Sequence, residues 1–516
     1  MELVQKNIHF NRIAKEAKNQ ITLEEDINIP DTKEDIESVL ISNYNVILED
    51  VKVTDQKIHI HGKLVYSILY RSLETGKLCA LTGSIPISEQ LYMEEVGSLD
   101  KITVKPKVED FSVGMINSRK LSIQSIVELQ AYIQEIYDQQ ISTQIEDMEC
   151  ECLQKECDFT QLSVCKKDIL RVREMITIPN NMPNVENLVY SCARISDMEY
   201  KPSEDQLNIQ GRAQILIIYD GERDSTNQVY QTTIPFGGMI DCLGANRNMI
   251  SKIDYELVSS EVHLEGDYDG EARSFSVELV FEYDMKMYEP QKIDVLWDVY
   301  GLEKEIIPKI HPIEYSILSG RYEGNFKATD FVKLESGDNH PVRVLYAEGK
   351  AILDKTEMTK DGVLLKGVIS CQILYVKTME ELEYGSSHFM IPFEKVVDQT
   401  EEFFNKNIKI SISTYSGDLH ISFDMEGNME VMANVSYNIF IFENVSSQNI
   451  TAVDVKEMDM EKYNNLPSMA VCFVSKKDTL WEMGKKYCVS LKQIRQLNQL
   501  TKEELKEGDR VLVVRG

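Results

Sequence analysis

Alternating apolar and polar residues run through most of this chain and predict β-strands in preference to helices. The alternation is clearest in three nine-residue stretches that begin with glycine and end with tyrosine: GKLVYSILY (Gly62–Tyr70), GRAQILIIY (Gly211–Tyr219) and GVISCQILY (Gly367–Tyr375). In all three, every second residue after the glycine is apolar or aromatic, and the positions between are mixed. This pattern is typical of a strand that buries one face, and the glycine indicates a bulge or a close backbone approach.

Proline spacing extends the similarity well beyond these stretches and indicates three copies of one repeat. In the first two copies an Ile-Pro pair lies upstream, with its proline 32 residues before the glycine (Ile29-Pro30 and Ile178-Pro179). A second pair follows all three tyrosines, its proline 16, 16 and 17 residues later (Ile85-Pro86, Ile234-Pro235 and Ile391-Pro392). The third copy has Leu334-Glu335 at the upstream position, so the beginning of this repeat differs from that of the other two.

Further alternating runs complete each copy and favour a mainly β protein. They span Lys120–Gln134, Ser274–Met287 and Asn428–Phe442. We therefore expect three β-rich domains, at residues 1–150, 151–312 and 313–446, each a two-sheet sandwich rather than a barrel. A short helix is expected over Asp31–Leu40, where Asp31 can cap the first turn and Ile36, Val39 and Leu40 share a side.

The last part of the chain has a different pattern. Residues 447–467 are polar and nonrepetitive, as in a linker, and residues 468–516 predict a small α+β domain. Thr479–Glu482 and Ser490–Gln493 have the spacing of capping boxes, so each starts a helix. Short apolar strands, Ala470–Val474 and Val511–Val514, bracket the two helices and give a β-α-α-β order.

Charge separates this small domain from the rest of the chain. The net charge of −30 argues against broad nucleic-acid binding, because phosphates recruit clustered Lys and Arg. From Met469 onward, however, ten Lys and Arg stand against six Asp and Glu. A basic end on an acidic body indicates a docking module for an acidic partner, and a solvated helix face is the alternative.

One residue pair on the first helix of this domain is a candidate anchor. Trp481 lies one step off the predicted buried row, and Lys485 follows one turn later, so both can face outward. A partly exposed tryptophan beside a cation is common in interfaces. The alternative is that Trp481 completes the small core.

Candidate catalytic chemistry is weak throughout. Four cysteines lie close in sequence (Cys150, Cys152, Cys157 and Cys165), but their spacing is not the paired C-x₂-C of strong zinc sites. Phosphate-loop, dinucleotide, zinc-protease and serine-hydrolase motifs are missing from the sequence. We expect no catalytic residue, metal or cofactor and no enzyme. The first residues lack a secretion signal and no run approaches a membrane span, so a reducing cytosol is expected.

The repeats resemble the SPOCS domains of spore-forming bacteria over most of residues 20–445. The matching elements of the first copy are PDTKEDIESVL, IHGKLVYSILY, SIPISEQ and NSRKLSIQSIVEL. The second and third copies keep the Gly, Tyr and Ile-Pro frame but lose the Asn-Ser-Arg-Lys turn, so they look like divergent members.

The C-terminal domain resembles a LysM domain over about 45 residues, from DTLW (Asp478–Trp481) to Gly508 before the last strand. LysM domains typically bind N-acetylglucosamine polymers through the loops before the first helix and after the second. Lys477, Cys488 and Glu507 replace a glycine, a glycine and a proline of the family pattern, which weighs against glycan binding. The candidate partner-binding residues are Lys477, Asp478, Trp481, Lys485 and Leu505.

Three SPOCS-like repeats followed by one LysM-like domain resemble the layout of clostridial spore-coat morphogenetic proteins. The resemblance implies a non-enzymatic scaffold in the mother-cell cytoplasm, at the forespore surface. Its LysM domain would bind a SpoIVA-like coat-basement ATPase, with other coat proteins as further partners, and so couple coat and cortex assembly. The alternative is a LysM protein of the spore envelope that binds peptidoglycan. A metal-dependent enzyme centred on the four cysteines is a third hypothesis.

Overall fold

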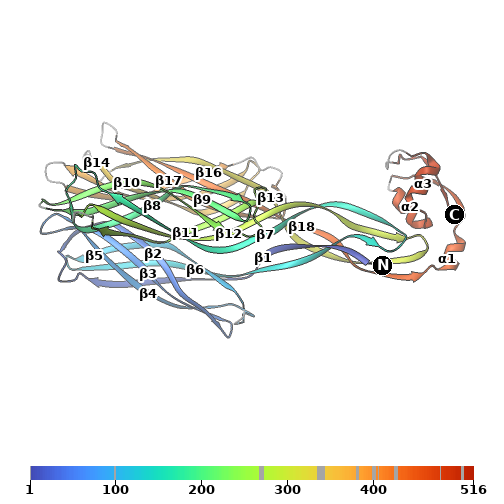
Figure 1. The fold of residues 1–516 in the computed structure, drawn as a ribbon, viewed down its shortest axis with the longest axis horizontal. Coiled ribbons are helices and arrows are strands. Elements are labelled where there is room, and N and C mark those ends of the chain that lie inside the picture. The colour runs from blue at the N-terminus through green and yellow to red at the C-terminus, as the bar shows by residue number, and fades with distance from the viewer. Residues whose placement is uncertain are drawn as a thin grey trace.

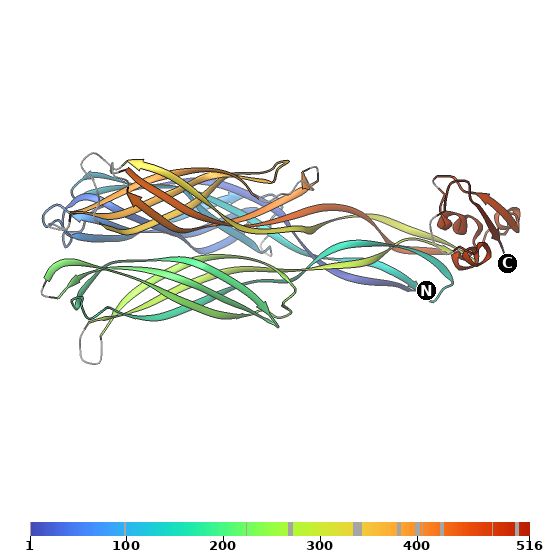
Figure 2. The same ribbon diagram turned by 90° about the horizontal axis from the view of Figure 1, so that it is seen from above.

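The protein is an elongated assembly of strands that narrows into a stalk and ends in a small helical module (Figures 1 and 2). The structure is a computed structural model that describes residues 2–97, 100–222, 224–266, 272–333, 343–378, 383–397, 403–404, 406–423, 428–476, 478–500 and 505–515. Within these residues, none of the helices is long and apolar enough to cross a membrane.

Each repeat folds as six antiparallel strands in two three-stranded sheets, which confirms the predicted sandwich. In repeat 1 one sheet has the order β1-β6-β5 and the other β2-β3-β4. GKLVYSILY lies in the central strand β3, where Leu64, Ile68 and Tyr70 are buried between the sheets. The strands are β1 (Glu2–Asn28), β2 (Ile36–Thr54), β3 (Lys57–Ser72), β4 (Leu78–Tyr92), β5 (Ile102–Asn117) and β6 (Lys120–Glu146).

Repeats 2 and 3 have the same sheet orders, β11-β12-β7 with β10-β9-β8, and β13-β18-β17 with β14-β15-β16. Repeat 2 contains β7 (Cys150–Thr177), β8 (Val185–Ser203), β9 (Gln206–Gly221), β10 (Asp224–Asp241), β11 (Ile250–Glu265) and β12 (Ser274–Gly301). Repeat 3 contains β13 (Lys304–Lys333), β14 (Arg343–Met358), β15 (Val363–Thr378), β16 (Glu383–Val397), β17 (Ile408–Phe423) and β18 (Asn428–Glu457).

The glycine that begins the first and third quoted stretches is required by a close backbone approach, as predicted, whereas a Cβ on Gly211 would meet the side chains of Met198 and Phe236. Gly62 faces Leu48 beside a register shift in β2, and Gly367 faces Leu353 beside the equivalent shift in β14. A methyl group on either glycine would overlap a carbonyl oxygen of the neighbouring strand. A side chain therefore cannot be accommodated where the adjacent strand bulges.

The helix expected over Asp31–Leu40 is wrong. Residues 31–35 form a turn, and β2 begins at Ile36, which is buried and pairs with Ser72 of β3. The apolar spacing that suggested a helix instead fits a strand with register shifts after Ile36 and Val39. Pairing with β3 thus overrides the local helical pattern.

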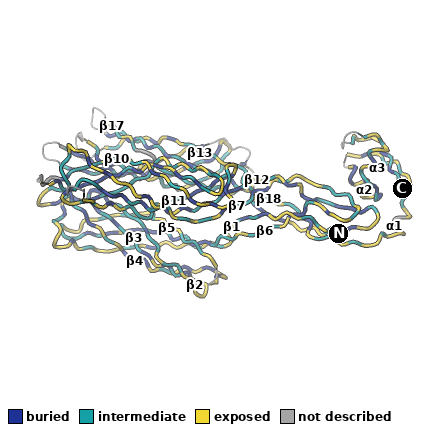
Figure 3. The backbone as a smooth tube through the Cα atoms, viewed as in Figure 1, coloured by how far each residue is buried: buried dark blue, intermediate teal, exposed yellow. Residues whose placement is uncertain are grey.

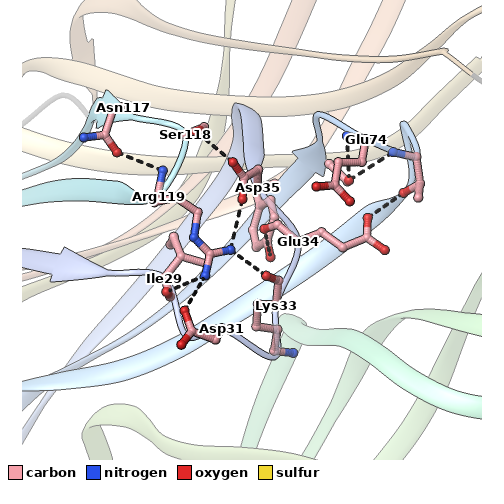
Figure 4. Close-up of polar contacts among 12 residues, drawn as sticks. Ile29, Asp31, Lys33, Glu34, Asp35, Glu74, Asn117, Ser118 and Arg119 are labelled. Carbon is pink, nitrogen blue, oxygen red and sulfur yellow. Dashed lines mark hydrogen bonds and ion pairs between the residues drawn. The ribbon is translucent and has the colours of Figure 1, made fainter.

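Arg119 binds this turn through hydrogen bonds at the end of the sandwich of repeat 1, called sandwich 1 (Figure 4). The Arg119 guanidinium donates to the carbonyl oxygens of Lys33 and Ile29, at 2.8 and 3.2 Å, and to the carboxylates of Asp35 and Asp31, at 3.0 and 3.2 Å. Tyr70 adds a hydrogen bond to the Glu34 carbonyl. The last residue of the quoted stretch therefore helps to close the sandwich.

Repeat 2 contains an equivalent arginine clasp, that is, an arginine that donates to the carbonyl oxygens of the turn, although its sequence lacks the Asn-Ser-Arg-Lys motif. Arg273 donates to the carbonyl oxygens of Met182, Ile178 and Pro179. Tyr219 donates to the Pro183 carbonyl, as Tyr70 does in repeat 1. Repeat 2 has thus kept the arginine and its role while the surrounding motif has changed.

Arg119→Ala is expected to lower the free energy of unfolding of sandwich 1 by about 1–2 kcal/mol, because two backbone carbonyls lose a charged donor. The expected loss is small because Arg119 is half-exposed, so water replaces part of its hydrogen bonding. Urea denaturation measures the change. Arg12→Ala, which removes an exposed ion pair with Glu135, is the control and is expected to change little. Equal effects of the two variants would contradict a structural role for the clasp.

The three sandwiches share a central core instead of standing apart. Apolar residues from the sheets β2-β3-β4, β8-β9-β10 and β14-β15-β16 form one cluster that includes Leu69, Ile218 and Leu374. Buried Asn227 of repeat 2 accepts from the Leu78 amide of repeat 1 at 2.6 Å and donates to the Leu78 carbonyl. Each of these sheets is therefore covered on both faces, which explains the apolar runs in their central strands.

The stalk is formed by the ribbons β1–β6, β7–β12 and β13–β18, which continue past their sandwiches and pack together (Figures 1 and 2). Phe10, Phe159 and Tyr315, one from each repeat, meet with ring centroids 4.7 to 6.4 Å apart. Buried positions therefore continue along the stalk (Figure 3). The ribbons also carry equivalent register shifts, at Ile13/Lys15, Met287/Tyr288 and Leu318/Gly320.

Two of the expected domain boundaries fall inside strands of the ribbons. Residue 312 lies in β13 and residue 446 in β18, because each ribbon runs on to the stalk end before the chain turns into the next repeat. The segment 447–467, expected to be a linker, is strand as far as Glu457 and then contains α1 (Met460–Asn465). Residues 458–468 are the actual connection to the C-terminal module.

The C-terminal module has the predicted β-α-α-β order: β19 (Met469–Phe473), α2 (Leu480–Tyr487), α3 (Leu491–Asn498) and β20 (Arg510–Val514). Thr479 caps α2 by accepting from the Glu482 amide at 3.2 Å, as its capping box predicts. The Ser490 side chain makes no capping hydrogen bond at α3, so that part of the prediction is wrong.

Candidate partner-binding site on the C-terminal module

Helix α2 has two faces with different contacts. Leu480, Met483 and Tyr487 pack into the module core together with Ile494 and the two strands. Trp481 lies outside this core cluster although it is only 8% exposed. Trp481 thus points away from the module core, but the stalk covers its side chain, so the expected partial exposure is wrong.

The stalk residue that meets Trp481 is Asp298, near the end of β12. The Trp481 Nε1 donates to Asp298 Oδ2 at 2.8 Å, and the Lys485 Nζ donates to both carboxylate oxygens at 2.6 and 2.7 Å. The Val299 amide also donates to Asp298 Oδ1, at 2.9 Å. One carboxylate thus joins both predicted anchor residues through charge-assisted hydrogen bonds.

Tyr300, two residues further along β12, fills the space beside Trp481. Its ring is 4% exposed and packs edge-on against the Trp481 ring, with centroids 4.9 Å apart. Its hydroxyl donates to the Val489 carbonyl at 2.9 Å. Burial, followed by the negative charge of Glu151, raises the pKa of Tyr300, so the hydroxyl stays a donor at neutral pH. A Cβ on Gly484 would overlap this hydroxyl, so a glycine at this position admits the ring.

A third stalk residue contacts the start of α3. Glu151 of β7 accepts from the Leu491 amide at 3.2 Å, where the helix has unpaired N–H groups. Glu151, Asp298 and Tyr300 are called the tip site below, and Trp481, Gly484 and Lys485 the α2 face. Sequence reasoning missed the tip site. Its available signal was the acidic character of residues 146–151 and 298–305, opposite in charge to the module.

The other predicted partner-binding residues lie away from the α2 face. Asp478 accepts from the backbone amide and hydroxyl of Ser475, at 2.9 and 2.7 Å, and these bonds lower the pKa of Asp478. Leu505 packs half-buried against the module core. Lys477 lies outside the described residues. Of the five predicted partner-binding residues, the structure therefore brings Trp481 and Lys485 together.

The four clustered cysteines follow a single strand, β7, and so spread along its length. Only Cys150 and Cys152 among them come close, with Sγ atoms 3.9 Å apart, and burial raises the pKa of Cys150. Cys157 pairs with Ile293 in the stalk, and Cys165 pairs with Lys286 in the sandwich. Among the described residues, no group of three or more His, Cys, Asp and Glu side chains could hold a metal ion.

Fold and site together define a class of protein, in which tandem β-sandwiches share a stalk and a small α+β module docks at its end. Three stretches match the family described as SipL, SPOCS domain, at residues 35–116, 184–265 and 342–420. Each match lies within one repeat. The chain therefore carries three SPOCS domains in tandem, and these matches relate it to sporulation. The matched residues do not include the C-terminal module, and neither curated proteins nor solved structures gave a match.

Proposed function

We propose that this protein is a non-enzymatic scaffold of spore coat assembly whose C-terminal module, a LysM-like domain, docks onto a SpoIVA-like coat-basement ATPase. The proposal places the protein in the mother-cell cytoplasm at the forespore surface, where it couples coat and cortex assembly. The observation that carries it is the combination of three SPOCS domains with a basic module that has Trp481 and Lys485 on one face of α2.

The shape of the protein supports a scaffold role. The longest strands, β13 and β18, have 30 residues each, which at about 3.3 Å per residue span about 100 Å. The sandwiches lie at one end of the ribbons and the module at the other (Figure 2). Attachment through the module would thus hold the SPOCS sandwiches at a distance from the partner, where they could engage a second layer.

Two strongly perturbed titratable groups, Cys192 and Tyr190, fit the non-enzymatic part of the proposal. Burial raises the pKa of Cys192 to about 12 and raises the pKa of Tyr190 well above its ordinary value. Both residues lie in or against the core shared by the three sandwiches. Their shifts come from packing between repeats, not from an open cleft where a substrate could bind.

Binding of the full-length protein to two kinds of target tests the proposal. The purified coat ATPase is immobilised in one arm, and insoluble peptidoglycan and chitin are used in the other. The expected result is retention by the ATPase and not by either glycan. Retention by glycan without ATPase binding would replace the scaffold hypothesis with the alternative, a glycan-binding protein of the spore envelope.

A further inference from the structure

The face of the module that carries Trp481 and Lys485 is already occupied by the protein itself. Asp298 takes three hydrogen bonds from these two side chains, and Tyr300 packs against the Trp481 ring. Any partner that binds the α2 face must first displace the tip site. The contact is therefore both a docking interaction and a potential block.

The contact consists of one aromatic pair, one ion pair and a few hydrogen bonds, which is small compared with the cores elsewhere in the protein. Lys485 remains 44% exposed in its side chain, so water and salt compete with the ion pair. The connection between Glu457 and Met469 has 11 residues, which fully extended reach up to about 35–40 Å. Release of the module needs only this local contact to break, because the module core and the stalk core are separate clusters.

The chemistry of the tip site indicates what the α2 face recognises. Asp298 and Tyr300 are two residues apart on one strand, and both side chains meet the module. The α2 face therefore fits a carboxylate and an aromatic ring presented side by side on an extended segment. The opposite charges of module and body favour the same pairing, with a net charge of −30 for the whole chain despite the basic module.

We propose that the tip site is a built-in competitor that keeps the α2 face closed until a protein partner presents an equivalent carboxylate and aromatic pair. This inference rests on the proposed function, in which that partner is the coat ATPase. The fraction of chains with a free module then sets the apparent affinity, since the apparent dissociation constant is the intrinsic one divided by that fraction.

The closed state is tested without any partner in the full-length chain. Trp297→Phe leaves Trp481 as the single tryptophan, because the sequence has two. Adding Asp298→Ala and Tyr300→Phe is expected to raise acrylamide quenching of Trp481 about two- to threefold, because the 8%-exposed side chain becomes accessible. Asp294→Ala, an exposed carboxylate on the same strand, is the matched control. Unchanged quenching in the double variant would overturn the closed state.

Competition is tested by titrating the purified coat ATPase into the same chains. Asp298→Ala with Tyr300→Phe is expected to bind about three- to tenfold more tightly than the parent, and Asp294→Ala to bind like the parent. If a chain whose module is released binds the ATPase equally or more weakly than the parent, the proposal that the tip site competes with the partner is overturned. If the ATPase binds neither chain, the proposed function and the competition both fail. The quenching result then still decides, independently, whether the module docks on the stalk.

Discussion

A chain carrying Trp481→Ala and Lys485→Glu together is expected to lose ATPase binding by at least about 100-fold. The substitutions remove an aromatic anchor and invert a charge, and buried tryptophans paired with cations are typical hot spots whose loss costs several kcal/mol. The module is expected to stay folded, because its core is formed by Leu480, Met483, Tyr487 and their neighbours, without Trp481. Binding to the purified ATPase, measured by calorimetry, gives the affinity.

Whether the affinity for the ATPase falls or rises in this variant tells whether the ATPase binds the α2 face or another surface of the module. The two substitutions also remove all three hydrogen bonds to Asp298, so they release the module from the stalk. If the partner bound elsewhere on the module, release would leave its affinity unchanged or increase it. Lys492→Glu is the matched control, because it makes the same charge change on the exposed side of α3. An equal loss in that variant would point to net charge instead of the α2 face.

Phe159→Ala is expected to lower the free energy of unfolding of the stalk by about 3–5 kcal/mol. Phe159 is 1% exposed and its ring contacts both Phe10 and Tyr315, so the substitution leaves a cavity among all three repeats. Thermal denaturation, with proteolysis mapping the cleavage sites, measures the loss and locates it. The sandwiches retain their separate cores and are expected to resist cleavage longer than the stalk.

The control for this substitution is Phe331→Ala, which removes the same atoms from a side chain that is 64% exposed. It is expected to change stability by less than about 1 kcal/mol, because no buried cavity forms. Similar losses in both variants would show that the stalk core does not depend on contacts among the three ribbons.

The sequence predicts the sandwiches well because each depends on patterns within one repeat. Alternation identified the strands, and the glycine before the apolar stretch indicated the close approach opposite a bulge, although Gly62 lies inside β3 and not at its start. Packing between repeats leaves no comparable signal. Phe10, Phe159 and Tyr315 look like ordinary inward residues of three strands, and nothing in the period of two tells which surface they bury against.

The candidate site shows the same division between local and distant information. Helical spacing alone placed Trp481 and Lys485 on one face, away from the module core. Asp298 and Tyr300 lie more than 180 residues earlier in the sequence, so no local pattern connects them to the module. Arg273 was missed for a different reason. The expected motif was the full Asn-Ser-Arg-Lys sequence, whereas the arginine alone makes the hydrogen bonds to the turn.

Under the proposed scaffold function, in which the protein links two assembling layers, the direction of the ribbons has a mechanical consequence. β13 and β18 run the length of the stalk and are paired from Lys304 with Glu457 to Lys333 with Asn428. Tension between the module and the sandwiches therefore acts along these strands, while their hydrogen bonds lie across them. Such a load shears many hydrogen bonds at once instead of opening them one by one. The stalk is thus built to resist stretching, and the module contact at Asp298 is the element that yields first.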